Sequence, residues 1–191
     1  MAEYRLLSVT LKTPHGMQSW LNRLGADGWR TRGATASFLL LEKSTVAREA
    51  ALVSITLRGP VGILRQVERC AGEGWELGAM GASFLFFDRP RDGAGRKLDY
   101  KMDSITLRSL AGVRKLADDY GEQGWRLRGF GPSLAIFERE EETRSTYRHE
   151  FESITLRTPA GIQALLAARG EAGWALSDAS RNLAAFSQAV G

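Results

Sequence analysis

Hydrophobic and polar residues alternate over four short segments of the chain, and each segment begins a copy of the same pattern. The copies read Ser-Val-Thr-Leu-Lys at 8–12 and Ser-Ile-Thr-Leu-Arg at 54–58, 104–108 and 153–157. Such alternation predicts β-strands. A tryptophan stands 21 residues after each serine, at Trp29, Trp75, Trp125 and Trp174. Four copies in 191 residues make an internal repeat.

A helix is predicted between each strand and its tryptophan. In the first copy, Thr13 and Pro14 provide an N-cap and a proline at the first helical position. Met17 and Leu21 share one helical face, and the glycine before each tryptophan suits a left-handed helix end. Two more strands follow, joined by a short Gly-rich hairpin turn. Each unit is therefore β-α-β-β, with expected ranges of about 3–43, 50–88, 100–139 and 149–188.

The expected fold is α+β, with four tandem repeats whose mostly antiparallel sheets are covered on one face by helices. A unit of about 40 residues buries too little surface to fold alone, so the four units have to pack on one another. The first and third units share Trp-Arg-x-Arg-Gly and an upstream tyrosine, which gives an A-B-A-B pattern. We expect two halves, 1–95 and 96–191, joined by the linker-like segment 89–95. The sequence leaves open whether these halves form one body or two lobes.

The first strand of each unit has an aliphatic face and a mixed face. We expect the aliphatic face to pack on the helix. That face carries Val9, Leu11, Ile55, Leu57, Ile105, Leu107, Ile154 and Leu156. The mixed face begins with one apolar residue and continues with Ser, Thr and a final Arg or Lys. The apolar residues are Leu6, Leu52, Met102 and Phe151.

Two interpretations of the mixed face stay open. In the first, its apolar end packs on another unit and its polar end faces solvent. In the second, the polar ends line a shared anion site, because each basic residue stands directly before the free N–H groups of a helix N-terminus. The Arg-x-Arg pairs alternate out of phase with the tryptophan and are expected on this same face. The candidate ligand-binding residues are Thr10, Lys12, Thr56, Arg58, Thr106, Arg108, Thr155, Arg157, Arg30, Arg32, Arg126 and Arg128.

The tryptophans and the single cysteine are expected in the core. Each repeated tryptophan starts a strand with its ring toward the helix, the alternative being a platform for base stacking. Trp20 lies on an apolar helical stripe, as does Cys70. One cysteine allows neither an internal disulfide nor a cysteine metal cluster. The charged run 138–144 is expected to be a solvated linker.

Composition and charge narrow the classes of function. The fractions of apolar (43%) and charged (25%) residues are ordinary for a globular protein. No apolar run approaches the roughly 20 residues of a membrane span, and the N-terminus lacks the order of a signal peptide. We therefore expect a cytoplasmic protein with no membrane partner. His15 and His149 stand in non-equivalent places without catalytic or metal-ligand spacing, so no catalytic residue, metal or cofactor is predicted.

The net charge of +4 suits an anionic partner, although basic and acidic residues are interspersed. These features favour a non-enzymatic binding protein for an anionic ligand, either a nucleotide-like small molecule or nucleic acid. The alternative is a structural or protein-interaction module with no small-molecule ligand. An enzyme with a single site between units is a third interpretation.

The segment Gly72-Glu-Gly-Trp-Glu-Leu77, and behind it 121–127, carries a resemblance to a known family. It resembles short bacterial domains of unknown function that have a Gly-Trp-Glu-Leu-Val-type motif after a helix. The resemblance covers each repeat, although the first and fourth depart from the motif at the Glu. It implies a small β-α-β-β fold in four tandem copies, and transfers no activity or catalytic residue.

Overall fold

A computed structural model of the chain describes residues 3–10, 13–93, 95–140, 145–180 and 182–190. The first two repeats comprise β1 (Tyr4–Ser8), α1 (Pro14–Ala26), β2 (Trp29–Ala34), β3 (Phe38–Lys43), β4 (Arg48–Ser54), α2 (Pro60–Gly72), β5 (Glu76–Met80) and β6 (Phe84–Pro90). The last two comprise β7 (Leu98–Ser104), α3 (Leu110–Gly121), β8 (Arg126–Phe130), β9 (Leu134–Glu140), β10 (Thr146–Ser153), α4 (Pro159–Glu171), β11 (Ala175–Ser180) and β12 (Leu183–Val190). The predicted β-α-β-β order is confirmed in every repeat.

Each repeat forms one three-stranded antiparallel sheet with its last strand in the middle. The strand orders are β1-β3-β2, β4-β6-β5, β7-β9-β8 and β10-β12-β11. In the first sheet Glu42 is in register with both Tyr4 and Arg30. The beginnings of the first and second strands therefore lie at the same end of the sheet, and the end of the first strand lies at the other.

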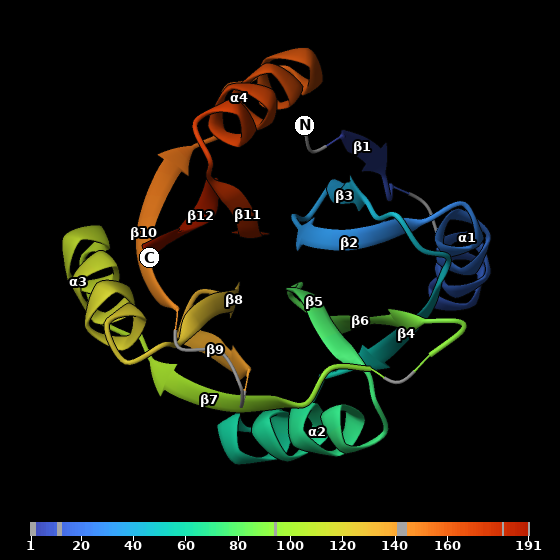
Figure 1. Cartoon of the computed structure of the whole chain (residues 1–191), viewed down its shortest axis with the longest axis horizontal. Helices are drawn as coiled ribbons and strands as arrows, with labels where there is room; N and C mark the ends of the chain where they lie inside the picture. The colour runs from blue at the N-terminus through green and yellow to red at the C-terminus, as the bar shows by residue number, and fades with distance from the viewer. Residues whose placement is uncertain (1–2, 11–12, 94, 141–144, 181, 191) are drawn as a thin grey trace.

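The four repeats are arranged as a ring around one axis (Figure 1). The strands β2, β5, β8 and β11 lie nearest the axis, and each contacts the inner strands of both neighbouring repeats. The helices lie on the outside, where each packs on the first strand of the next repeat. Because α4 packs on β1, the last repeat closes the ring on the first. Repeats one and three therefore face each other across the axis.

The molecule is shortest along the ring axis, so the ring has two broad faces, one of which is toward the viewer in Figure 1. We call one the turn face: it holds the ends of β1, β4, β7 and β10, the helix N-termini and the hairpins at 35–37, 81–83 and 131–133. We call the other the linker face: it holds the helix C-termini and the connections between repeats, such as 44–47 and 91–97. The antiparallel register places these two groups at opposite ends of every sheet.

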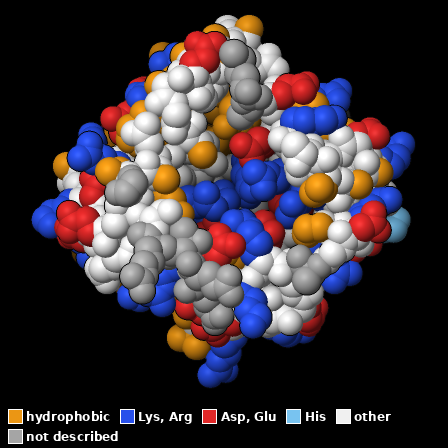
Figure 2. Space-filling view, viewed as in Figure 1, with side chains coloured by type: hydrophobic (Ala, Val, Ile, Leu, Met, Phe, Trp, Pro, Cys, Tyr) orange, Lys and Arg blue, Asp and Glu red, His pale blue; other side chains and the backbone are white. Residues whose placement is uncertain are grey.

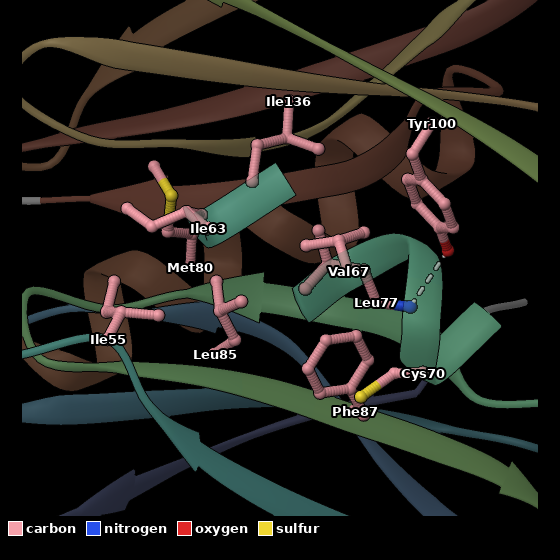
Figure 3. Packing of buried hydrophobic residues seen from close by; sticks show 10 residues of the cluster. All are labelled: Ile55, Ile63, Val67, Cys70, Leu77, Met80, Leu85, Phe87, Tyr100 and Ile136. Atoms are coloured by element: carbon pink, nitrogen blue, oxygen red, sulfur yellow. Dashed lines mark hydrogen bonds between the residues drawn. The ribbon is translucent and has the colours of Figure 1, made fainter. Parts of the chain in front are cut away.

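The hydrophobic core consists of four clusters, each formed by one repeat and the repeat after it. Figure 3 shows the cluster in which Val67 and Phe87 of the second repeat meet Tyr100 and Ile136 of the third. Equivalent clusters join repeats three and four, four and one, and one and two. The apolar residues that begin the mixed strand face pack on the cluster of the preceding repeat; these are Leu6, Leu52, Met102 and Phe151. No cluster belongs to one repeat alone, which explains why the repeats fold together.

The predicted helix ends are also observed. The hydroxyls of Thr13, Ser109 and Thr158 accept a hydrogen bond from the third residue after each of them, as N-caps do. A glycine with φ near +80° precedes each repeated tryptophan, in the left-handed region that a residue without Cβ adopts without strain. These glycines are Gly28, Gly74, Gly124 and Gly173.

The two charged linkers differ from expectation. Arg89 and Pro90 belong to β6, so the connection between the halves starts after them. Glu138 is not in a solvated linker: it lies in β9 and is 2% exposed. The prediction grouped Glu138 with the charged residues that follow it, but Glu138 still belongs to the strand, whose alternation directs its side chain inward. Positions 141–144, Leu11 and Lys12 lie outside the described residues.

Candidate functional site

The repeated Ser-Ile-Thr-Leu-Arg stretch is a turn, and not the strand that its alternation predicts. The strand ends at the serine. In the second repeat the backbone N–H of Arg58 donates to the carbonyl of Ile55 at 3.0 Å, and the backbone N–H of Thr56 donates to Oγ of Ser54 at 3.4 Å. The same bonds recur in the third and fourth repeats. The serine and the turn therefore end the strand and start the helix.

The leucines of this turn are exposed, so the expectation that they pack on the helix is wrong. Leu57, Leu107 and Leu156 are 100–102% exposed, whereas the isoleucines two positions earlier are buried as predicted. The three leucines also have φ between 61° and 66°. This conformation favours glycine or asparagine and costs a leucine about 1–2 kcal/mol. The fold alone gives no reason for leucine at these positions.

The candidate residues of this turn lie apart from one another around the turn face. Thr10, Thr56, Thr106 and Thr155 are exposed, as are Arg58, Arg108 and Arg157. The Nε atoms of these arginines donate to the carbonyl of the serine four residues before, at 3.0–3.3 Å. Lys12 lies outside the described residues. The structure therefore does not bring the described residues of this set together into one pocket.

Two grooves on the turn face lie between neighbouring repeats, each with one of these arginines at its edge. One groove, of about 390 Å³, lies between repeats four and one and is lined by Leu6, Leu40, Ile154 and Arg157. The other, of about 290 Å³, lies between repeats three and four, next to Arg108. Both linings are mainly apolar.

Of the other four candidate residues, the Arg-x-Arg pairs of repeats one and three, Arg32 and Arg128 lie within electrostatic reach of each other on the inner strands. Arg30 and Arg126 stand two residues earlier on the same two strands. A β-bulge interrupts each inner strand, and the bulged positions are occupied by Arg32, Gly78, Arg128 and Ser177. Bulges commonly redirect a side chain. Here Arg32 and Arg128 are 2% and 3% exposed. A Cβ at Gly78 would lie 2.5 Å from the carbonyl oxygen of Thr31, so the second repeat needs a glycine at its bulge.

Each Arg-x-Arg pair shares one carboxylate from the middle strand of its sheet. Glu42 contacts Nη2 of Arg30 at 2.7 Å and Nε of Arg32 at 3.0 Å. In the same way Glu138 pairs with Arg126, and with Nε of Arg128 at 3.2 Å. Although burial acts to raise it, the two arginines hold the pKa of Glu42 to about 2. Both carboxylates are therefore ionised, and each faces two guanidinium groups.

The second repeat adds acidic residues to this central charge cluster. Glu76 contacts Arg48 at 3.2 Å and Arg96 at 2.9 Å, and Asp88 pairs with Arg48. Arg96 also lies 3.5 Å from Glu140 at the edge of the cluster. Among the described residues, six arginines thus face five carboxylates, with the positive excess at repeats one and three. Figure 2 shows a hollow at the ring centre with Lys or Arg and Asp or Glu side chains in it.

Arg32 is the least compensated member of this cluster. Its Nη1 atom is buried and has no hydrogen-bond partner among the described residues. Burial, together with the nearby charges of Arg128 and Arg30, lowers the pKa of Arg32 to about 9, although the carboxylates of Asp88 and Glu42 act to raise it. By contrast, pairing with Glu138 outweighs burial and raises the pKa of Arg128. An anion near Arg32 would therefore relieve a charge that the protein leaves partly unpaired.

The ring is closed by polar side chains that cross from one repeat to the preceding one. The hydroxyl of Tyr100 accepts a hydrogen bond from the backbone N–H of Leu77 at 3.0 Å, and Nε2 of His149 accepts from Leu127 at 3.1 Å. The hydroxyl of Tyr4 lies next to the backbone of Leu176, in the equivalent place. His149 is thus equivalent to the two tyrosines, although the sequence placed it in no repeated position.

Removing one of these hydroxyls is expected to weaken the interface between repeats. We expect Tyr100→Phe to lower the free energy of unfolding by about 1–3 kcal/mol, because the buried N–H of Leu77 loses its acceptor. The matched control is Tyr120→Phe, since that half-buried hydroxyl bonds the side chain of Asp103 at 3.1 Å and leaves no backbone group unpaired. Urea unfolding of both variants measures the difference, and equal losses would contradict the role given to Tyr100.

Asp178 joins three inner strands near the axis. Its Oδ2 accepts hydrogen bonds from the backbone N–H of Phe130 at 2.9 Å and Met80 at 3.3 Å, and its Oδ1 accepts from Ala179 at 2.8 Å. Complete burial raises the pKa of Asp178 well above its usual value. This carboxyl is therefore a structural group that holds the three inner strands together.

The tryptophans have the structural role that the sequence predicts. Trp125 is buried, and Trp29, Trp75 and Trp174 pack at the edges of the core clusters. A Lys or Arg side chain lies 4.3–5.9 Å from each of the four ring centres, and these cations are Lys43, Arg89, Arg139 and Arg169. Trp20 is half-buried and Cys70 is buried. The covered rings support the core interpretation over the base-stacking one.

The acidic residues of the central cluster were not predicted from the sequence as part of a site. Glu42, Asp88 and Glu138 each stand five residues after the hairpin serine, at the same point of the third strand, and Ser187 takes this place in the fourth repeat. An alignment of the third strands would have shown this. In the second repeat Glu76 occupies the position that Arg30 and Arg126 have in the first and third.

Comparison with known proteins adds no identity. No family model, no curated protein and no solved structure matches the chain. The resemblance to the Gly-Trp-Glu-Leu-Val-type domains therefore stays an expectation. Within the described residues, no group of three His, Cys, Asp or Glu side chains is placed to hold a metal ion. In the same part of the chain, no helix has the length and apolar character to cross a membrane.

Proposed function

We propose that this protein is a non-enzymatic binding protein for a compact, multiply charged anion, which it holds in the hollow at the ring centre. The observation that carries the proposal is the pairing of four arginines with two carboxylates there: Arg30 and Arg32 share Glu42, and Arg126 and Arg128 share Glu138. A guanidinium that shares its carboxylate keeps N–H donors for a second anion.

The arginines differ in exposure, so a bound anion could contact both partly exposed and buried guanidinium groups. The side chains of Arg30 and Arg126 are 24% and 22% exposed, and they come from opposite repeats. Arg32 is 3% exposed, with its Nη1 buried and unpartnered. An anion with several charged groups in a row, such as pyrophosphate or the phosphates of a nucleotide, suits such an arrangement. A compact anion also suits a single hollow of this kind better than an extended nucleic-acid backbone does.

The proposal is tested by titrating pyrophosphate, ATP and a single-stranded oligonucleotide into the protein by calorimetry. The double variant Arg30→Gln with Arg126→Gln should weaken pyrophosphate binding at least about tenfold, because each charged hydrogen bond contributes about 1.5–3 kcal/mol. Arg32 and Arg128 keep their carboxylates in this variant, so the ring should remain folded.

The matched control removes the same charge from the turn face, by Arg58→Gln with Arg157→Gln. It should leave pyrophosphate binding unchanged. A loss in the control but not in the central variant would move the site to the turn face. Binding of the oligonucleotide alone would replace the small anion by nucleic acid, and no binding of any of the three would overturn the proposal.

A further inference from the structure

The turn face carries most of the large hydrophobic side chains that the described part of the chain exposes. Five of the six lie there, in the repeated turns or in the first helical turn after them. They are Leu57, Val61, Leu107, Leu110 and Leu156. The sixth, Val46, lies on the linker face. Scattered exposed residues need no explanation, but a concentration on one face indicates an interaction surface.

The three turn leucines are costly to the isolated chain in two ways. Each is completely exposed, and each has a φ of 61–66°, where glycine or asparagine would be unstrained. The same leucine is nevertheless present in all three described turns. A contact outside this chain would offset both costs.

The turn face is also basic. Arg58, Arg108 and Arg157 directly follow the three leucines and are exposed. The helix N-termini beside them are the positive ends of helix dipoles. In the first turns of all four helices, which the structure describes completely, there is no acidic residue. A partner that fits this face would offer it both apolar and negatively charged groups.

The geometry of the ring indicates a flat partner. The molecule is shortest along the ring axis, so each end of the ring is a broad face, and the turns all lie at the same end of their sheets. Equivalent residues of repeats around one axis lie at the same height along it, so the leucine–arginine pairs can touch one plane together. Their side chains project from the surface, and a plane that yields to projecting groups receives them without needing a matching set of pockets.

We propose that the turn face docks on the surface of an anionic lipid bilayer, with the leucines in the interfacial region and the arginines at the lipid phosphates. A second copy of the chain fits less well, because two turn faces would oppose arginine to arginine. The expectation of no membrane partner rested on the lack of a long apolar run, and surface docking requires no such run.

Sedimentation with lipid vesicles tests the proposal. Vesicles of phosphatidylcholine alone are compared with an equal mixture of phosphatidylcholine and phosphatidylglycerol, at low and high sodium chloride. The chain should bind the mixed vesicles, bind less at high salt, and bind phosphatidylcholine at least about tenfold more weakly. Leu57→Asn with Leu107→Asn and Leu156→Asn should weaken binding to the mixed vesicles at least about tenfold.

Asparagine tolerates positive φ, so this triple variant should be no less stable in urea, and its loss of binding cannot be assigned to unfolding. Val46→Asn on the linker face is the matched control and should bind as the unchanged chain does. The absence of vesicle binding, or binding that survives the triple variant, overturns the proposal. Dimerisation that the triple variant abolishes, without vesicle binding, would assign the face to a second copy instead.

Discussion

The variant Glu138→Ala is expected to lower the free energy of unfolding by about 3–5 kcal/mol. The side chain of Glu138 is 3% exposed and neutralises both Arg126 and Arg128. Removing it leaves the guanidinium of Arg128 buried, with the carbonyl of Ser177 at 3.4 Å as a remaining contact. An unpaired charge in a protein interior costs far more than the ion pair itself contributes.

The chain offers a matched surface pair as the control for this variant. Glu49 contacts Arg89 at 2.9 Å, but the two side chains are 42% and 38% exposed. Glu49→Ala should therefore cost no more than about 1 kcal/mol, because water solvates the arginine that is left. Urea unfolding measures both. If the two variants lose the same stability, Arg128 finds water or another acceptor after the substitution, and the centre of the ring is less sealed than its burial indicates.

The sequence was sufficient for the repeat, the order of elements and most of the core. These follow from short-range rules: a 3.6-residue stripe, an N-cap hydroxyl and a glycine before tryptophan are each local signals. The alternation of polar and apolar residues predicted that Leu57, Leu107 and Leu156 would be buried in a strand, but they are exposed in a turn. A turn in which leucine occupies the left-handed position carries no Gly or Asn to mark it, so the pattern at Ser54–Arg58 continues to resemble a strand.

The sequence pattern placed the turn residues and the Arg-x-Arg pairs on one strand face and in one anion site. In the structure these two groups lie apart. The turn arginines stand after the end of the first strand, whereas Arg30 stands at the beginning of the second. Because Arg30 is in line with Tyr4 through Glu42, it lies a strand length, roughly 13 Å, from the turn. Antiparallel order thus separates the turn arginines from Arg30, because they stand at opposite ends of the sheet. The bulges that aim Arg32 and Arg128 inward, and the closure of the ring, depend on contacts between distant segments.

Acid is expected to destabilise the ring through His149. Burial, partly offset by Asp118, lowers the pKa of this imidazole from 6.5 to about 4. A lowered pKa means that the folded state prefers the neutral ring, so stability is full above pH 6.5 and is lost as the pH falls toward 4. The loss amounts to about 3 kcal/mol in all. Protonation would also remove the Nε2 lone pair that accepts the N–H of Leu127.

Equivalent positions of the repeats suggest two opposite substitutions, His149→Tyr and Tyr100→His. A tyrosine performs the task of His149 at position 100, so His149→Tyr should keep an acceptor for Leu127 and abolish the loss of stability between pH 6.5 and 4.5. Tyr100→His should add a second loss in the same range. Urea unfolding at a series of pH values gives the free energy of unfolding of each variant and of the unchanged chain. Groups that titrate in all of them, such as Glu42 and Asp178, contribute equally and cancel in the comparison. Parallel pH profiles for the unchanged chain and His149→Tyr would show that the buried imidazole is not the acid-sensitive group, and would move that sensitivity to the carboxylates at the ring axis.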